Sequence, residues 1–467
     1  MKKISDNLLE PSQQQLNNLL KYYQTGRYID AEKLSLSITQ EFPKHQFAWK
    51  VLAAVLKQKG RINESLIVSQ KSVQLDPQDA KAHNNLGIIM KELGRLEEAE
   101  ASYRQAIKLK PDLAEAHSNL GFIMQELGRL EEACSAFIQA INLKPDFTDA
   151  YANFAFVVKN VRFTSSNIKL YPLLIELINN GNYIRPLDLA PSILSLLKHD
   201  PLIKDLLLEE NFATNPREVN SIISSLDKLT LLHQIMRVCR LPDLQFEKFF
   251  VSMRSLLITN LDNFEATPVF IHFLSSLSLH CFTNEYIYIE KEEETKLVKN
   301  LETEITQTIS KSEQPEAKKI LCLACYRMLH QYNWCQKLKA LDNLEEIKSR
   351  LIEEPYTEKA IVKEIPILGE ISDNVSSKVR EQYEENPYPR WVKIGLPLKV
   401  KLISEICTAE NLHLNSKSIQ DVIAPDILVA GCGTGQHSIG TASTYSDCQV
   451  TAVDLSLASL AYAKRKT

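Results

Sequence analysis

Glycine is scarce in this sequence of 467 residues. Only 13 positions are glycine, about 2.8 % of the chain, whereas the usual share is about 7 %. Because β-hairpin turns need glycine at positions of positive φ, so few glycines argue against an all-β protein and against a flexible linker protein. The remaining composition suits a globular, helix-rich chain, since 44 % of the residues are hydrophobic and 24 % are charged.

Several other features are missing. The formal net charge is −4, which gives no electrostatic case for binding nucleic acid or an anionic membrane. The sequence contains no uninterrupted stretch of about 18 apolar residues, so it predicts no membrane span. The N-terminal residues 1–11 lack the apolar segment of a signal peptide. The nine cysteines are odd in number and scattered, as in a protein with reduced thiols. We therefore expect a soluble, cytoplasmic protein.

A repeat of 34 residues runs through the N-terminal third. Its columns contain four prolines (Pro43, Pro77, Pro111, Pro145), four glycines (Gly26, Gly60, Gly94, Gly128) and an arginine after each glycine (Arg27, Arg61, Arg95, Arg129). Within 80–113 the apolar residues have helical spacing up to Gly94, and a glycine at such a position is typical of the end of a helix. A second helix follows until Pro111 blocks its continuation. One helix pair cannot bury its apolar face alone, so neighbouring pairs must stack.

This pattern resembles the tetratricopeptide repeat. The copies lie at 46–79, 80–113 and 114–147, with a weaker first copy at 12–45 and an extra helix from 148, so that the repeats cover 12–160. The resemblance implies an α-solenoid whose concave face, formed by the first helices, binds a protein or peptide partner.

One column of the first helices contains asparagine three times, at Asn85, Asn119 and Asn153. An amide side chain offers both a donor and an acceptor and can pair with a peptide backbone. The column is similar to the asparagine ladder in the repeats of O-linked N-acetylglucosamine transferases, which implies peptide binding. The alternative is that these amides only make contacts between repeats. We expect His83 and His117, in another column, to be packing residues.

Residues 161–370 have no sequence period and are predicted to form a helical middle region. The predicted helices cover 171–180, 191–208, 215–240 and 290–309. A zinc site is one interpretation of four residues in the segment 322–335, namely Cys322, Cys325, His330 and Cys335. The apolar helical pattern around the first two cysteines favours core packing instead, so we predict no metal ligands.

A glycine-rich loop lies near the C-terminus. Residues 426–430 form a short apolar run that predicts a buried strand, and the loop 431–435 and a helix follow it. A second apolar run then ends in Asp454, 19 residues after the last loop glycine. Such a βαβ unit suits a nucleoside-containing cofactor, because the glycines let the cofactor approach the backbone and the acid can accept both ribose hydroxyls.

The order of these motifs resembles class I S-adenosylmethionine-dependent methyltransferases. The resemblance implies S-adenosyl-L-methionine as the cofactor and assigns its contacts to seven residues: Gly431, Cys432, Gly433, Thr434, Gly435, Asp454 and Leu455. Many relatives have an acidic residue two positions before the first glycine, where this chain has Val429. That departure removes one contact expected at the methionine end of the cofactor. The sequence identifies no catalytic residue.

The fold class that follows is mostly α. It comprises a tetratricopeptide α-solenoid, a helical middle region, an aromatic and proline-rich lead-in at 371–422, and the incomplete start of a Rossmann-like α/β domain at 423–467. This order resembles bacterial, often cyanobacterial, fusions of tetratricopeptide repeats with a methyltransferase. A class I methyltransferase sheet has about seven strands and this sequence supplies two, so we expect a truncated methyltransferase that transfers no methyl group. The alternative function is an interaction scaffold without catalysis.

Overall fold

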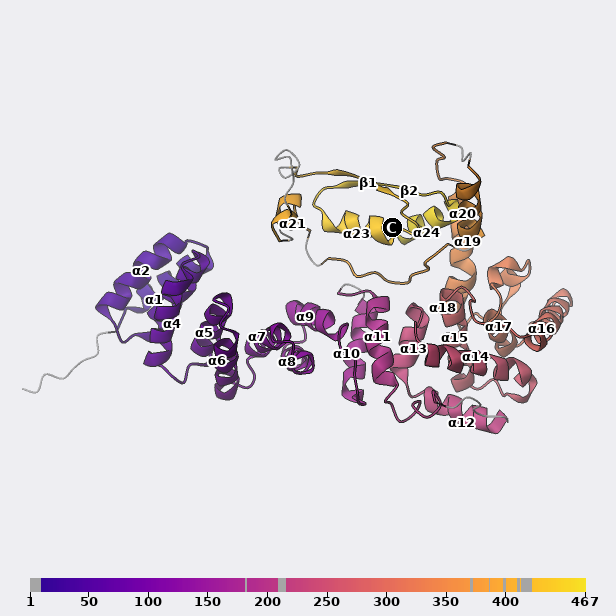
Figure 1. Ribbon diagram of the computed structural model, residues 1–467, viewed down its shortest axis with the longest axis horizontal. Helices are drawn as coiled ribbons and strands as arrows, with labels where there is room; N and C mark the ends of the chain where they lie inside the picture. Colours follow the sequence, from indigo (N-terminus) through magenta and orange to yellow (C-terminus); the bar gives the residue numbers. More distant parts are fainter. Residues whose placement is uncertain are drawn as a thin grey trace, which may run out of the picture. The chain divides into compact units, whose positions relative to one another are not determined.

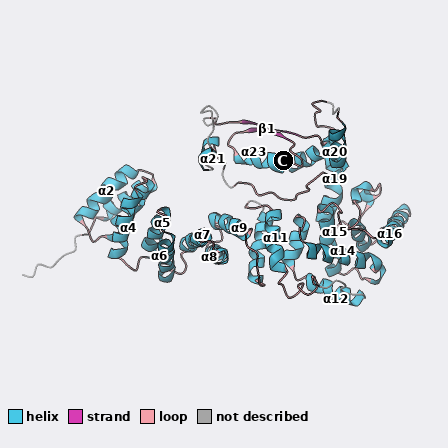
Figure 2. Cartoon of the chain, viewed as in Figure 1, coloured by secondary structure: helices cyan, strands magenta, loops and turns pink. Residues whose placement is uncertain are grey.

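The computed structural model describes residues 10–180, 183–208, 216–369, 373–385, 387–397, 400–409, 412 and 422–467. These residues are mostly helical, which confirms the predicted fold class in its main feature (Figures 1 and 2). The chain divides into two compact units, Met1–Val161 and Arg162–Thr467. Within the described ranges, no helix combines the length and the apolar character needed to cross a membrane.

The first unit consists of consecutive helix pairs. Its helices are α1 (Gln13–Gln24), α2 (Tyr28–Glu41), α3 (Gln46–Gln58), α4 (Ile62–Leu75), α5 (Ala80–Glu92), α6 (Leu96–Leu109), α7 (Ala114–Glu126), α8 (Leu130–Leu143) and α9 (Thr148–Val158). Within each repeat the two helices pack against each other, and the second helix also packs against the first helix of the next repeat. First helices of successive repeats, such as α5 and α7, are also in contact.

The turn inside each pair depends on glycine. Gly94 has a φ of +73°, and the other three glycines of its column lie between +72° and +74°. Only glycine adopts this left-handed conformation at little cost, which explains why the column is invariant within the chain. The following arginine begins the second helix and pairs with an acid three residues later, as Arg129 does with Glu132 at 2.6 Å. Arg129 also reaches Glu100 of the preceding repeat at 2.9 Å.

Close packing of the two helices in a pair depends on glycine at a second position of the repeat. The ring of Tyr103, fully buried on α6, packs on Gly87 of α5 so closely that a Cβ there would lie 2.7 Å from it. Phe137 on α8 packs in the same way on Gly121 of α7, where a Cβ would lie 2.9 Å from the ring. The small residue on the first helix therefore creates the space that the aromatic ring fills.

The second unit begins with a bundle of helices. These are α10 (Tyr171–Asn180), α11 (Pro186–Leu197), α12 (Pro216–Leu226), α13 (Thr230–Val238), α14 (Leu244–Thr259), α15 (Pro268–Thr283), α16 (Glu292–Ser310), α17 (Ala317–Ala324), α18 (Glu345–Lys348) and α19 (Glu354–Val362), with 3-10 turns at Ile168–Leu170, Leu261–Asn263, Leu329–Gln331 and Cys335–Lys337 and a π-helical turn at Ser349–Glu353. The predicted helices at 171–180 and 290–309 correspond to α10 and α16.

Two predicted helices differ from the structure. The helix expected over 191–208 ends at Leu197, because Pro201 has no amide hydrogen to continue it. The segment expected as one helix over 215–240 is two, α12 and α13, with Asp227 in the turn between them. The break lets Leu226 and Leu229, on either side of it, both lie in the core. Residue 215, the predicted start, lies outside the described residues.

A buried ion pair lies inside this bundle. Arg254 on α14 and Glu294 on α16 approach to 3.7 Å, and each side chain is 2 % exposed. Hydrogen bonds offset part of the cost of burying the two charges: Arg254 Nη2 donates to the carbonyl of Ile289 at 2.6 Å, and the hydroxyl of Tyr326 donates to Glu294 at 3.1 Å. Arg254 Nε and Glu294 Oε1 are buried without such a partner. The pair connects α14 and α16 with the end of α17.

The C-terminal part of the second unit is a small α/β arrangement. It contains α20 (Asn374–Glu385), α21 (Ile403–Ala409), β1 (Asp426–Ala430), α23 (Gln436–Thr444), β2 (Gln449–Val453) and α24 (Leu457–Lys466). The strands β1 and β2 are parallel, and Val429 lies opposite Ala452 in their register. Val429 is buried, whereas Leu428 on the other face is 68 % exposed. The two strands and the helix between them match the predicted βαβ unit; of the Rossmann-like domain, the described residues contain only these strands.

We expect the substitution Gly121→Ala to lower the stability of the repeat unit by about 1–3 kcal/mol, because the new methyl group overlaps the Phe137 ring in a packed core. Hydrogen exchange of the α7 and α8 amides measures the effect. The control is Gly440→Ala on α23, where a Cβ has no neighbour within 4 Å and alanine should be neutral or slightly stabilising. Equal effects of both substitutions on their own helices would contradict the packing argument.

Candidate functional site

The candidate cofactor site centres on the loop 431–435 between β1 and α23. Gly431, Gly433 and Gly435 have φ values of +69°, +52° and +87°, so the loop conformation requires glycine at all three positions. A Cβ on Gly431 would have no neighbour within 4 Å, which leaves open space beside the backbone there. A Cβ on Gly435 would lie 2.6 Å from that of Ala463 on α24, so the last glycine permits close packing of the two helices.

The structure brings Asp454 to this loop. Asp454 follows β2 directly, and its Oδ2 accepts a hydrogen bond from the amide of Gly433 at 2.7 Å. Its Oδ1 accepts one from the amide of Ser456 at 3.0 Å. Each carboxylate oxygen keeps a further lone pair that can accept a ribose hydroxyl. The half-buried acid and the open backbone at Gly431 thus fit a nucleoside.

Two other predicted cofactor residues have buried side chains. Cys432 is 6 % exposed, and burial together with the nearby Asp454 carboxylate raises the pKa of its thiol to about 11. Thr434 is 2 % exposed, and its hydroxyl donates to the carbonyl of Pro389 at 2.8 Å. These side chains support the loop from inside, so that only their backbone can face a cofactor. Leu455, by contrast, is 44 % exposed.

The segment 387–397, here called the strap, fixes the loop from outside the βαβ unit. The indole nitrogen of Trp391 donates to the carbonyl of Thr434 at 2.9 Å. The hydroxyl of Tyr462 on α24 accepts from the amide of Trp391 at 2.9 Å and donates to its carbonyl. Both aromatic side chains are buried. The sequence predicted an aromatic and proline-rich lead-in at 371–422 but did not identify these contacts. Residue 386, directly before the strap, lies outside the described residues.

Glu384 at the end of α20 is a supporting residue that sequence reasoning missed. Its carboxylate accepts hydrogen bonds from the amides of Leu457 at 2.6 Å and Ala458 at 3.2 Å, and so caps the start of α24. Next to it, the hydroxyl of Ser456 donates to the carbonyl of Tyr383 at 3.1 Å. An isolated glutamate gives no sequence signal for this role, because its partners are more than 70 residues away.

A large open groove lies beside the site. Its volume is about 1600 Å³, more than a single nucleoside fills, and its walls come from β2, α20, α24 and the residues 365–369. Asp454 and Leu455 are among the residues that line it. The carboxylate that is predicted to bind ribose therefore faces accessible space.

The asparagine column lies on first helices, as predicted. Asn85, Asn119 and Asn153 are half-buried, on α5, α7 and α9. The amide nitrogen of Asn119 donates to Oδ1 of Asn84 in the preceding repeat at 3.0 Å. This contact favours the alternative, packing between repeats, for Asn119.

The neighbouring histidine column has a structural role that the sequence analysis described only as packing. The ring nitrogens Nε2 of His83 and His117 lie 3.1 Å and 2.8 Å from the carbonyl oxygens of Pro77 and Pro111. Trp49 makes the equivalent bond to Pro43 at 2.9 Å. Each proline turn is thus joined to the helix that follows it.

The alternative zinc site is not assembled. Cys322 lies buried on α17 and Cys325 lies buried directly after it. Burial raises the pKa of the Cys322 thiol to about 12, which opposes the thiolate form that zinc requires. Cys335 lies 3.5 Å from the hydroxyl of Tyr356 instead. In the part of the chain that the structure describes, these cysteines and His330 do not form a group that could hold a metal ion.

Comparison with known families supports the repeats. Family models described as TPR repeat or tetratricopeptide repeat match residues 69–101, 89–128 and 114–147. The chain therefore contains tetratricopeptide repeats, which indicate a protein–protein interaction module. No curated protein sequence matches the chain.

Solved structures with the repeat fold are also similar. A MamA crystal structure is 23 % identical, with 30 % of this chain and 81 % of that chain covered and a TM-score of 0.28. MamA from Desulfovibrio magneticus RS-1 is 17 % identical, with 31 % and 81 % covered and a TM-score of 0.29. The first TPR of Spaghetti (RPAP3), solved with an HSP90 peptide, is 20 % identical, with 24 % and 89 % covered and a TM-score of 0.24.

We expect Trp391→Phe to lower the stability of the glycine loop by about 1–3 kcal/mol, because the buried carbonyl of Thr434 loses its donor. Hydrogen exchange at the amides of residues 433–435 measures the loss. Trp49→Phe is the matched control, since its indole bond to Pro43 is exposed and water can replace it. Unchanged exchange in Trp391→Phe would show that the strap does not hold the loop.

Proposed function

We propose that this chain is an interaction scaffold whose repeat unit binds an extended peptide segment of a partner protein. The observation that carries this proposal is the stack of helix pairs over residues 46–147, in which first helices of successive repeats lie side by side. Such stacking produces an extended surface with regularly spaced side chains. A peptide backbone has a similarly regular series of donors and acceptors, which spaced amides can pair with.

The first helices offer both polar and apolar contacts. Asn85 and Asn153 are half-buried amides on this surface. Phe156 on α9 is 52 % exposed, with the ammonium of Lys159 4.4 Å from its ring centroid. Phe122 on α7 is paired in the same way with Lys91 at 4.2 Å. This combination suits a peptide whose apolar side chains pack on the rings while its backbone pairs with the amides.

We expect peptides selected from a random display library on the full chain to lose at least tenfold in affinity when Asn85, Asn119 and Asn153 are all replaced by alanine. Two lost hydrogen bonds to the peptide, at Asn85 and Asn153, of about 0.5–1.5 kcal/mol each are sufficient for this effect. The change at Asn119 removes its bond to Asn84 of the preceding repeat. Fluorescence anisotropy of labelled peptides provides the measurement.

The matched control for that experiment changes three exposed residues of the second helices that also lie 34 positions apart. These are Gln74, Lys108 and Asn142. Alanine at these three positions should leave the affinity unchanged. If both triple variants bind as the parent chain does, the asparagine column serves repeat packing and the proposal for this surface fails.

A second candidate function is binding of S-adenosyl-L-methionine at the glycine loop. The specific observation in its favour is that Asp454 contacts Gly433 at the carboxyl ends of two parallel strands, where nucleoside cofactors bind in open α/β sheets. When bound, this cofactor supplies an electrophilic methyl group. We assign Asp454 to the ribose hydroxyls and the backbone at Gly431 to the close approach of the cofactor.

The remaining residues of this candidate site position the loop. Trp391 and Thr434 fix its backbone, and Glu384 fixes the start of α24 beside Asp454. Val429, where many class I methyltransferases have an acid, is buried and points away from solvent. The methionine end of the cofactor therefore lacks one of its usual partners, and no group on these residues is assigned to catalysis.

We expect titration calorimetry of the full chain with S-adenosylmethionine to detect binding that is lost in Asp454→Ala, because the ribose hydroxyls lose their charged acceptor. The control is Asp426→Ala, which removes an exposed acid at the other end of the paired strands. Absence of binding by the unaltered chain would leave the scaffold as the function.

A further inference from the structure

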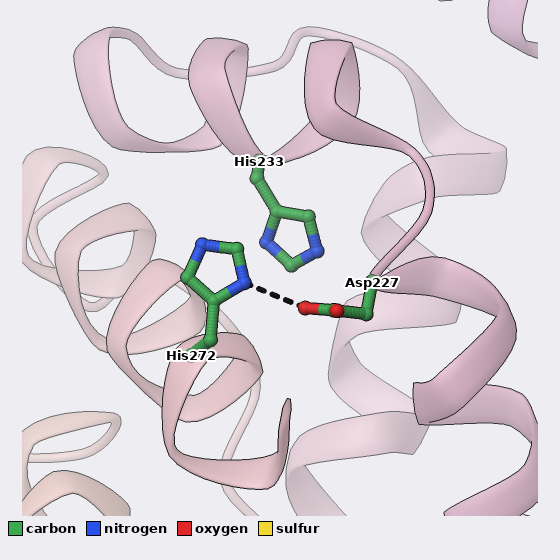
Figure 3. Close-up of side chains that lie close together, drawn as sticks. All are labelled: Asp227, His233 and His272. Carbon is green, nitrogen blue, oxygen red and sulfur yellow. Dashed lines mark hydrogen bonds and ion pairs between the residues drawn. The ribbon is translucent and has the colours of Figure 1, made fainter. Parts of the chain in front are cut away.

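A cluster of three potential metal ligands lies in the helical bundle of the second unit (Figure 3). Asp227 lies directly after α12, His233 is on α13 and His272 is on α15. Each offers one ligand atom, and the three atoms all lie within 4.8 Å of one another. Figure 3 shows the two imidazole rings and the carboxylate facing one another from three segments of the chain. These three residues belong neither to the tetratricopeptide repeats nor to the candidate cofactor site.

The hydrogen bonds of His233 orient it as a ligand. Its Nε2 lies 3.2 Å from the carbonyl oxygen of Leu226. A carbonyl oxygen can only accept, so Nε2 carries the proton and Nδ1 presents a lone pair. A backbone carbonyl that fixes the second ring nitrogen in this way is the usual outer partner of a metal-binding histidine.

Nδ1 of His233 can coordinate a metal ion if it gives up its present hydrogen bond. This nitrogen lies 2.9 Å from the hydroxyl of Ser276. That hydroxyl has a second acceptor, the carbonyl of His272, at 3.1 Å. An ion bound to Nδ1 takes the place of this hydroxyl, so the Ser276 side chain must rotate about χ1, and its hydroxyl can then donate to the carbonyl of His272 instead of Nδ1.

The other two ligands share a proton. Nδ1 of His272 lies 2.7 Å from Oδ1 of Asp227. In tetrahedral zinc sites with bonds of about 2.0–2.1 Å, neighbouring ligand atoms lie about 3.3 Å apart, so a cation can replace this proton after a slight opening of the pair. His233 is buried, but the side chains of His272 and Asp227 are 41 % and 32 % exposed. One coordination position therefore stays open to water.

We infer that Asp227, His233 and His272 bind one divalent transition-metal ion of the Zn²⁺ type, with water as the fourth ligand. Two imidazoles and one carboxylate are the donor set that suits such ions, whereas Mg²⁺ and Ca²⁺ prefer oxygen ligands alone. The metal would tie the turn after α12 to α13 and α15, and so brace this part of the bundle.

The surrounding charges are compatible with a cation. Arg237 donates to the hydroxyl of Ser276 at 3.0 Å, and its charge is paired with Glu346 at 3.4 Å. The carboxylate of Asp227 supplies the negative charge that the ion requires.

The test is titration of the full chain with Co²⁺, followed by its visible d–d absorption, and with Zn²⁺, followed by calorimetry. We expect one equivalent of each ion to bind, and the Co²⁺ spectrum to lack the near-ultraviolet charge-transfer band of thiolate ligands. Asp227→Asn and His272→Gln should each weaken binding by more than about 100-fold, since loss of an outer-shell partner alone costs about 10–100-fold. Both positions are partly exposed, so both variants should retain the circular dichroism spectrum of the parent chain.

The matched controls are His199→Gln and Asp205→Asn, exposed residues of the same unit outside the cluster. They should bind both ions as the parent chain does, and Zn²⁺ should raise the melting temperature of the controls but not of the ligand variants. Equal binding by parent and ligand variants would place the ion elsewhere and overturn the inference. A thiolate charge-transfer band, or no binding by the folded parent chain, would overturn it as well.

Discussion

The packing of an aromatic ring on a glycine sets the spacing of the repeat unit. Tyr103 on Gly87 and Phe137 on Gly121 hold their helix pairs at the distance that the rings allow. In the repeat 46–79 the corresponding residues are Ala53 and Ser69, and in the repeat 12–45 they are Leu19 and Ser35. All four are buried. A larger residue on the first helix thus accompanies a smaller one on the second; Leu19 with Ser35 fills about the volume of Gly121 with Phe137, whereas Ala53 with Ser69 fills less. The spacing of α5 and α7, which carry Asn85 and Asn119, follows from the contact between ring and glycine.

The candidate cofactor site depends on a comparable close contact, but one made by distant residues. Gly435 allows α23 to approach Ala463, and the Trp391 indole holds the loop carbonyl from outside the βαβ unit. The repeats are supported by neighbours within about one repeat length, as expected for a solenoid. The glycine loop is instead supported by the strap and by Glu384, which come from segments that precede the strands. The conformation of the loop is therefore a property of the second unit and not of the motif alone.

This difference explains which parts could be predicted from the sequence. The helix pairs follow from the 34-residue period because their turns, caps and contacts are local, and Asp454 was predicted beside the loop because strand ends in a parallel βαβ unit adjoin. The break at Asp227 was missed, since burial of Leu226 and Leu229 outweighs helical continuity there. The approach of His233 to His272 was also missed, because it depends on the tertiary packing of α13 against α15. The cysteines at 322 and 325 have a metal-like spacing, yet their burial at the end of α17 favours a role in core packing.

The energetics favour the repeat surface over the glycine loop as the main binding site. A charged hydrogen bond contributes about 1.5–3 kcal/mol, while association costs about 4–15 kcal/mol of translational and rotational freedom. Asp454 alone, with Val429 in place of an acid, therefore cannot hold a cofactor. The further affinity must come from apolar contact with Leu455 and the adjoining groove, which is wide and open. The stacked first helices offer several such contacts in a row, since α5, α7 and α9 carry Asn85, Asn119 and Asn153, and α7 and α9 add the rings of Phe122 and Phe156. An extended peptide would therefore gain affinity with each of these helices that it spans.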